Sequence, residues 1–204
     1  MGKVKGQILA PHWLVVTLDS PESGNAFSEE EISGIEEVFE RYKGNYKGII
    51  FKSEGRRFFC SGGNLKKYRK MNRKQGLKAN RVIRSYLRTL DLLKIPTVAI
   101  VDGDCYGGGL ELLSVFDHVI ATPQSFFGFW QRKISLTFGW EGRLKQRMAE
   151  QALRSCSLGA RTLPASTALR LGLVDEVAPR SFAMERALHW LNQQSRLSSY
   201  PVEF

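Results

Sequence analysis

The sequence predicts an α/β fold in which helices pack around mainly parallel sheets, and two patterns support this prediction. Short apolar runs typical of buried strands, such as 97–101, alternate with longer segments of helical periodicity, such as 78–93. Glycine-rich turns join two of these strands to the helices that follow. Such alternation favours right-handed crossover units, which lay helices on the faces of a parallel sheet. The 204 residues show no internal repeat or linker, so we expect one domain spanning 1–204.

The expected elements follow in chain order. Segments 5–9 and 13–18 predict a β-hairpin. Ser28, with Glu31 three residues later, predicts a capping box at the start of a helix that ends near Gly44. The later elements are a strand at 46–52, a basic helix or loop at 65–74, a helix at 78–93, a strand at 97–101, a helix at 110–116, a strand at 117–121, a short aromatic segment at 126–129, helices at 141–158 and 164–171, a strand at 174–177 and a last helix at 181–194.

The composition is that of an ordinary globular protein, with 43% hydrophobic and 25% charged residues. No apolar run is long enough to span a membrane, and residues 1–10 lack the apolar core of a signal peptide. The three cysteines, Cys60, Cys105 and Cys156, are odd in number and widely spaced. This spacing predicts free thiols in a reducing, cytoplasmic compartment, and no Cys/His spacing indicates a metal site.

Two glycine turns carry the chemical signal. The first lies in Phe58–Leu65, which reads F-F-C-S-G-G-N-L, and the second is Gly107–Gly109, followed closely by Glu111. Backbone N–H groups from two such turns are the usual construction of an oxyanion hole, and a nearby carboxylate can move a proton. Either turn alone is more simply a tight turn, and Glu111 alone is equally well explained by the helix dipole. Together they favour a catalytic site.

With these motifs the sequence resembles the crotonase superfamily, the enoyl-CoA hydratase/isomerase family. The similar segments are Leu18–Phe27, Cys60–Leu65, Lys94–Ala121 and Ala168–Asp175. The resemblance implies a ββα superhelix and enolate stabilisation on an acyl thioester. It also implies a substrate carried by coenzyme A or an acyl carrier protein, no separate cofactor, and a homotrimer or hexamer.

The resemblance also assigns site residues. It places the thioester oxygen at the backbone N–H groups of Gly63 and Gly108, and it makes Glu111 the residue that moves the proton. Since a backbone donor does not depend on the side chain, Gly63 can stand where the family often has alanine. The expected substrate-binding residues are Ala26, Ser61, Lys66, Trp130 and Trp140.

The sequence departs from the family pattern at the second catalytic acid. Gln131 stands where hydratases carry a glutamate, and an amide does not usefully take or give a proton. Glu141 is a possible substitute, although a glutamate at a helix start is the simpler interpretation. The chain also ends soon after the segment 181–194, where typical members continue for several helices. The acyl pocket is then open, completed by a neighbouring subunit, or non-functional.

The net charge of +10 and the pI of about 9.7 favour polyanionic ligands. Three interpretations stay open, namely a solvated surface, a rim that attracts coenzyme A phosphates, and a dock for an acidic carrier protein. Nucleic acid is disfavoured because no RNA-recognition motif accompanies the charge. Many of the bases crowd the first glycine turn: Lys52, Arg56, Arg57, Lys66, Lys67, Arg69, Lys70, Arg73, Lys74 and Lys78.

The leading functional prediction is a thioester enzyme of the isomerase or decarboxylase type, because one acid suffices for either reaction. One alternative is an enoyl-CoA hydratase in which Gln131 holds the water. Another is a non-catalytic thioester-binding or assembly subunit, which the short C-terminus and Gln131 favour.

Overall fold

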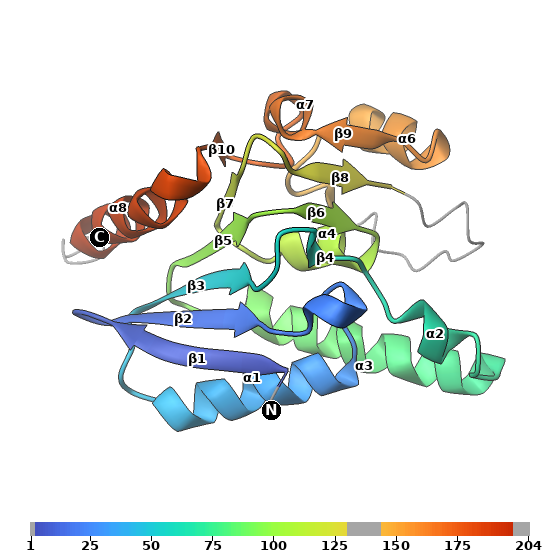
Figure 1. Cartoon of the computed structure of the whole chain (residues 1–204), viewed down its shortest axis with the longest axis horizontal. Helices are drawn as coiled ribbons and strands as arrows, with labels where there is room; N and C mark the ends of the chain where they lie inside the picture. The colour runs from blue at the N-terminus through green and yellow to red at the C-terminus, as the bar shows by residue number, and fades with distance from the viewer. Residues whose placement is uncertain (1–2, 130–143, 198–204) are drawn as a thin grey trace, which may run out of the picture.

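Two sheets organise the chain, and the larger has six strands in the order β1-β2-β3-β5-β7-β10 (Figure 1). The computed structural model describes residues 3–129 and 144–197. Neighbouring strands of this sheet run parallel, except in the β1–β2 hairpin. The strands are Val4–Leu9 (β1), Trp13–Leu18 (β2), Gly48–Ser53 (β3), Thr97–Val101 (β5), His118–Ala121 (β7) and Glu176–Val177 (β10).

The smaller sheet has four strands in the order β4-β6-β8-β9, of which only β8 and β9 pair antiparallel. Three times the chain passes from the larger sheet into the smaller one, from β3 to β4, from β5 to β6 and from β7 to β8. Helices follow β4 and β6, and this order confirms the predicted ββα superhelix. The strands are Phe58–Cys60 (β4), Asp104–Tyr106 (β6), Phe126–Gly128 (β8) and Thr162–Pro164 (β9).

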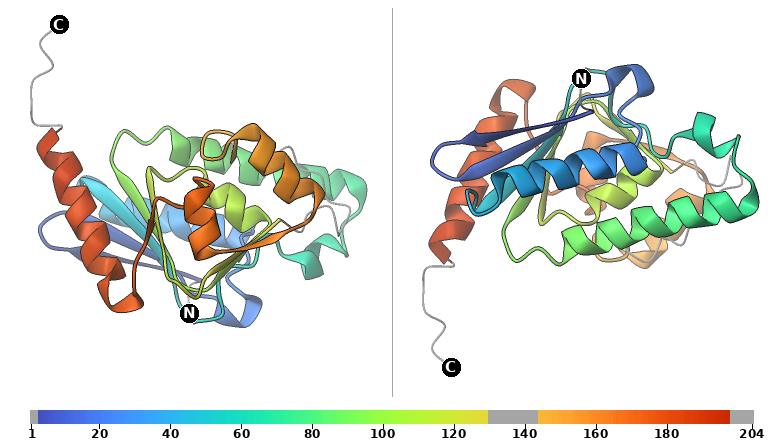
Figure 2. Two further views of the ribbon diagram at one scale, coloured as in Figure 1. Left: turned by 90° about the horizontal axis from the view of Figure 1, so that it is seen from above. Right: turned by 90° about the horizontal axis from the view of Figure 1, so that it is seen from below.

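The helices cover both faces of the larger sheet, as Figure 2 shows for α8 on one side and α1 and α3 on the other. Strand β5 is buried on both faces: Val98 and Ile100 pack beneath α8, while Ala99 and Val101 face the main core. The described helices are Pro21–Ser23 (η1, a 3₁₀ turn), Glu29–Tyr42 (α1), Leu65–Tyr68 (α2), Arg73–Asp91 (α3), Gly108–Leu113 (α4), Glu150–Leu158 (α6), Ala165–Arg170 (α7) and Arg180–Leu197 (α8).

The elements with a strong local signal form as predicted. The hairpin, strand β5 and the capping box of α1 are confirmed, and the Glu31 carboxylate accepts the Ser28 N–H at 3.0 Å. The open alternative at 65–74 resolves as the short helix α2 followed by a turn. Helix α3 starts five residues earlier than predicted, because Asn72 and Gln75 form a capping box there.

Three expectations were wrong. Strands β6 and β9 were missed, since each has only three residues and is defined by its neighbours in the smaller sheet. The helix expected at 110–116 spans Gly108–Leu113, and Phe116 instead packs on Phe51 with ring centroids 5.2 Å apart. The helix expected at 141–158 is interrupted, since 145–149 are non-helical and α6 spans Glu150–Leu158, while 141–143 lie outside the described residues. In the turn before α6, Arg147 donates to the Asp175 carboxylate at 2.8 Å.

All three cysteines are buried and unbridged, as the sequence predicted. Among residues 3–129 and 144–197, none of the helices has the length and apolar character needed to cross a bilayer.

Candidate active site

The first glycine turn, Ser61–Asn64, is held by backbone pairing with the loop before α1. Ser61 N–H donates to the Gly24 carbonyl at 2.9 Å, and Phe27 N–H donates to the Gly62 carbonyl at 2.8 Å. The loop is fixed in turn by buried Asn25, whose amide donates to the carbonyls of Glu54 and Phe58, each at 2.9 Å. The turn therefore has a fixed backbone on the side that faces α1.

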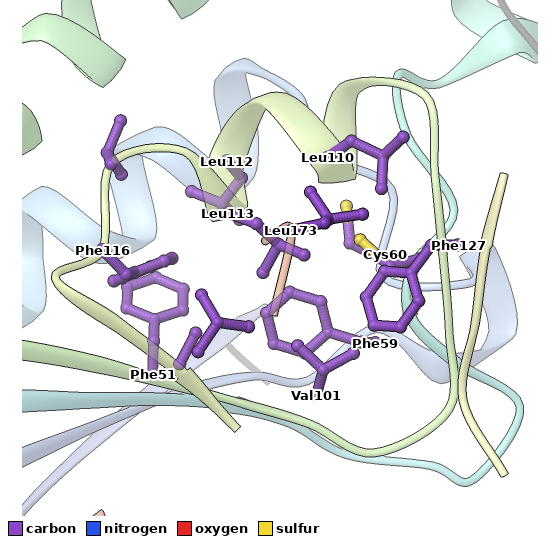
Figure 3. Packing of buried hydrophobic residues seen from close by; sticks show 14 of the residues in the cluster. Phe51, Phe59, Cys60, Val101, Leu110, Leu112, Leu113, Phe116, Phe127 and Leu173 are labelled. Atoms are coloured by element: carbon purple, nitrogen blue, oxygen red, sulfur yellow. The ribbon is translucent and has the colours of Figure 1, made fainter. Parts of the chain in front are cut away.

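The second turn, Gly107–Gly109, lies between β6 and α4 and is enclosed by backbone. Gly107 N–H donates to the Gly128 carbonyl at 3.1 Å. A methyl group on Gly109 would lie 2.7 Å from the Cys60 carbonyl oxygen and 2.9 Å from the Cys105 sulfur. Only glycine allows this approach without displacement of β4. Figure 3 shows how α4 is anchored below the turn, where its leucines pack with aromatic side chains of the core: Leu110, Leu112, Leu113, Phe59 and Phe127.

The two turns meet through their glycines. A methyl group on Gly108 would lie 3.4 Å from the Gly63 nitrogen, and one on Gly62 would lie 2.8 Å from the Tyr106 carbonyl oxygen. Gly62 also has φ +96°, a conformation that side chains rarely adopt. Among the backbone hydrogen bonds of the described turns and loops, neither Gly63 nor Gly108 is a donor. Two N–H groups are therefore brought together at the start of α4.

Glu111 lies one turn into α4 and is buried, with 8% of its surface exposed. Its neighbours in the helix are buried leucines. A carboxylate in such a place usually has a partner or a chemical role.

Tyr68 at the end of α2 joins these groups. A methyl group on Gly63 would lie 2.9 Å from its ring carbon Cε2, so the ring covers the first turn. Its hydroxyl donates to the Asn80 Oδ1 atom of α3 at 2.9 Å. Burial raises the pKa of the Tyr68 phenol, and the carboxylates of Glu29 and Glu111 raise it further. The Glu111 carboxylate is therefore close enough to the Tyr68 phenol for its charge to affect the phenol pKa.

The predicted substrate-binding residues have different surroundings. Ala26 is buried beside the first turn, between Asn25 and Phe27. Ser61 is partly buried, and its hydroxyl makes only a long contact of 3.4 Å with the Ser23 carbonyl. Lys66 is exposed on α2. Of the predicted residues that the structure describes, five lie within or directly beside the two turns, while Lys66 lies on α2; the five are Gly63, Gly108, Glu111, Ala26 and Ser61.

Four predicted residues lie outside the described residues, namely Gln131, Trp130, Trp140 and Glu141. Phe129, the last described residue before them, is fully buried in the core. Within the described part of the chain, no three His, Cys, Asp or Glu side chains are grouped so that they would hold a metal ion.

Sequence reasoning missed Tyr68 and Asn25. Tyr68 is the only aromatic residue in the basic stretch 65–74, which was a weak signal at best. Its contact with Gly63 and its proximity to Glu111 depend on tertiary packing. Asn25 was noticed within a motif, but its role in fixing the loop depends on carbonyl groups 29 and 33 residues away.

Comparison with known protein families agrees with this arrangement. The family described as Enoyl-CoA hydratase/isomerase matches residues 12–202. The short-chain-enoyl-CoA hydratase of Clostridium acetobutylicum is 27% identical over 183 residues, which cover 88% of this chain and 70% of that protein. YngF of Bacillus subtilis, which carries an enoyl-CoA hydratase/isomerase name, is 28% identical over 180 residues, or 86% of this chain and 69% of its own length.

Solved structures show the same fold. The crystal structure of an enoyl-CoA hydratase from Bacillus anthracis has a TM-score of 0.87 and 24% identity, covering 94% of this chain and 76% of that chain. An enoyl-CoA hydratase from Thermoplasma volcanium has a TM-score of 0.86 and 21% identity, covering 93% of this chain and 77% of that chain. At these identities the likeness shows the fold alone.

Proposed function

Because the chain belongs to the enoyl-CoA hydratase/isomerase family, we propose that it stabilises the enolate of an acyl thioester and uses it for double-bond isomerisation or decarboxylation. The observation that carries the proposal is the meeting of the two glycine turns, with Gly108 packed against the Gly63 nitrogen. A pair of preorganised N–H donors is the main requirement for holding a developing oxyanion. Buried Glu111 supplies a proton-transfer group beside them.

In the isomerisation, Glu111 removes a proton from the α carbon of a 3-enoyl thioester. The electron pair moves onto the thioester oxygen, where the N–H groups of Gly63 and Gly108 hold it. Glu111 then returns the proton to the γ carbon, and the double bond moves by one position. One acid completes this cycle, and no atom is gained or lost.

In the decarboxylation, the bond between the α carbon and the substrate carboxylate breaks and CO2 leaves. The electron pair stays behind as the same enolate, bound by the same two donors. Glu111 delivers a proton to the α carbon, so this reaction also needs only one acid.

Hydration is the second candidate, and the named hydratase from Clostridium acetobutylicum favours it. In this alternative Gln131 orients the water that adds to the β carbon. An amide cannot accept the proton of that water, so Glu111 would serve both proton-transfer steps. A 3-hydroxyacyl product would distinguish hydration from isomerisation.

Substrate carrier and assembly belong to the same proposal. The thioester is carried by coenzyme A or an acyl carrier protein, and no further cofactor enters the chemistry described. A homotrimer or hexamer is proposed from family resemblance. Light scattering of the purified protein tests the assembly, and a monomeric mass would contradict it.

The decisive experiment is α-proton exchange in heavy water with a panel of acyl-CoA and acyl-carrier thioesters, together with CO2 release from a malonyl-type thioester. Wild type is expected to exchange or release CO2, and Glu111→Gln to lose about 10²–10⁴-fold in rate. The matched control is Glu37→Gln, which removes an exposed carboxylate of α1 and should leave the rate unchanged. If wild type turns over none of the thioesters, the proposal fails in favour of a binding-only subunit.

A further inference from the structure

The positive charge of this protein is concentrated in one stretch. Residues 65–90 contain ten of the chain's 30 lysines and arginines and none of its 20 acidic residues. The remaining 20 bases therefore balance the 20 acids, and this stretch alone accounts for the net charge of +10. It comprises α2 and nearly all of α3.

The bases of α3 lie on one face of the helix. At about 100° per residue, the five bases after Arg73 fall within an arc of about 120°, opposite the apolar side chains that α3 buries in the core. With a rise of about 1.5 Å per residue they extend over about 21 Å. We call these exposed residues the basic face: Lys74, Lys78, Arg81, Arg84 and Arg88.

The basic face is not neutralised within the described chain. Among residues 3–129 and 144–197, none of its five members takes part in an ion pair, whereas Lys67 on α2 pairs with Glu30 of α1. Bases spaced three or four residues apart on a helix repel one another and lower its stability. An acidic partner would relieve this repulsion and gain affinity from it.

Apolar surface accompanies the charge. Leu77 lies among the bases with 60% of its surface exposed, and Val82 is 37% exposed. Beside them a groove of about 510 Å³ runs between α1 and α3, which lie side by side in the right-hand view of Figure 2. Apolar members of its lining are Ile32, Met71, Ala79 and Val82. Acids Glu29 and Glu36 stand on the α1 wall, so an acidic partner would be directed toward α3.

The basic face is connected to the candidate active site. Tyr68 covers Gly63 and is hydrogen-bonded at 2.9 Å to Asn80, which lies between Lys78 and Arg81 on α3. A molecule bound along α3 would therefore pass beside the residue that links this helix to the first glycine turn.

We propose that the basic face of α3 is the docking surface for an acidic helical carrier protein that presents the acyl thioester on its pantetheine arm. This inference rests on the proposed function and names the carrier of its substrate. A charged stripe of about 21 Å matches the length of a partner helix, whereas the charges of coenzyme A are gathered at its nucleotide end. Exposed Leu77 and the apolar groove suit an amphipathic protein helix and have no counterpart in a nucleic-acid backbone.

Binding tests the inference without any turnover. The probe is a fluorescently labelled bacterial acyl carrier protein without its pantetheine arm, titrated at low and physiological salt. Wild type should bind in a salt-sensitive manner, and Lys78→Glu/Arg81→Glu should lose about 10-fold or more in affinity. Lys74→Glu/Arg88→Glu is the second variant, and unchanged melting temperatures would show that both variants fold.

The matched control is Lys47→Glu/Arg154→Glu, which changes the net charge equally at exposed positions outside α2 and α3. It should leave the affinity within about twofold. Equal losses in the control would mean a net-charge effect alone, and absent binding by wild type would also overturn the inference. Tighter binding of a short single-stranded RNA that displaces the carrier protein would assign the basic face to nucleic acid instead.

Turnover then separates this inference from the proposed function. The first substrate is 3-butenoyl- or malonyl-carrier protein and the second is the same acyl group on pantetheine, so the two differ only in the partner. Lys78→Glu/Arg81→Glu should lower kcat/KM about 10-fold for the first substrate and leave the second within about twofold. If neither thioester reacts with wild type, the proposed function fails, while the binding titration still decides whether the docking surface exists.

Discussion

The two glycine turns of the candidate site differ in what surrounds them. The second turn is enclosed, since a methyl group on Gly109 would meet the Cys60 carbonyl oxygen at 2.7 Å and the Cys105 sulfur at 2.9 Å. At Gly63 in the first turn, the three atoms nearest to an added methyl group all belong to the Tyr68 ring, the closest at 2.9 Å. Gly109, next to the proposed donor Gly108, is therefore held by backbone packing, whereas the proposed donor Gly63 lies beneath the Tyr68 side chain.

This difference assigns separate roles to the two halves of the site. The turn at Gly108 and the helix that carries Glu111 are part of the core, so their geometry depends on the stability of the fold. The turn at Gly63 borders α2, and through Tyr68 it is linked to the exposed helix α3. A partner bound on α3 would thus be linked through Tyr68 to the first turn and not to the second.

The largest effect is expected from Gly109→Ala. The new methyl group collides with the backbone of β4, and overpacking of this kind costs about 3 kcal/mol in unfolding free energy. Denaturant unfolding measures the loss. Gly76→Ala in α3 is the control, because nothing lies within 4 Å of the added methyl group, and alanine should stabilise that helix by about 0.5–1 kcal/mol. Equal stability of the two variants would mean that Gly109 is not enclosed.

The next effect concerns alkaline pH and the packing beneath the second turn. Burial raises the pKa of the Cys60 thiol from 9.0 to about 12, although hydrogen bonds with Gly62 and Phe27 oppose the shift. The folded state therefore favours the neutral thiol. Its contribution to stability is complete below pH 9 and is lost as the pH rises from 9 to about 12, by roughly 1 kcal/mol per pH unit.

Ultraviolet absorbance of the thiolate and unfolding curves across that pH range check this prediction. Cys60→Ala should show a shallower decline than wild type. A Cys60 thiol that ionises near pH 9 in the folded protein would mean that the region around β4 and α4 is open to water, which would contradict the close packing of Gly109 against Cys60.

A smaller effect is expected for the hydroxyl that links the first turn to α3. Tyr68→Phe removes the hydrogen bond to Asn80 and should cost about 1 kcal/mol of unfolding free energy. Tyr86→Phe is the matched control, because the Tyr86 hydroxyl is buried without a hydrogen-bond partner in the described part of the chain. Its removal should be neutral or stabilising by up to about 1 kcal/mol. Thermal unfolding of both variants measures the two changes in stability. Equal losses of stability would contradict the hydrogen bond from Tyr68 to Asn80.

The smallest effect is expected from Gly63→Ala. Its backbone φ is not in the positive region, and the new methyl group meets the edge of a ring that can tilt. The lower entropy of the unfolded chain offsets the contact, so stability should change by less than about 1 kcal/mol. Turnover should persist because the donor is the backbone N–H. A collapse of stability as large as that of Gly109→Ala would show that the first turn is equally enclosed.

Local patterns were sufficient for much of the fold. The Ser28–Glu31 capping box, strand β5 and the two strand–turn–helix glycine segments each carry their own signal within a few residues. Local patterns failed for β6 and β9, because each has only three residues and forms a strand only through pairing with neighbouring strands. They also failed at 145–149, which is non-helical and where Arg147 forms an ion pair with Asp175.

The sequence by itself determined the family resemblance, the two glycine turns and Glu111 as the buried acid, because each depends on residue types at short spacing. Only the tertiary structure decided that Gly63 and Gly108, 45 positions apart, come together, since the parallel pairing of β4 with β6 aligns the ends of two strands. The same holds for Tyr68, whose ring reaches Gly63 and whose hydroxyl reaches α3. Such contacts arise from the packing of distant segments, which no local pattern of residues records.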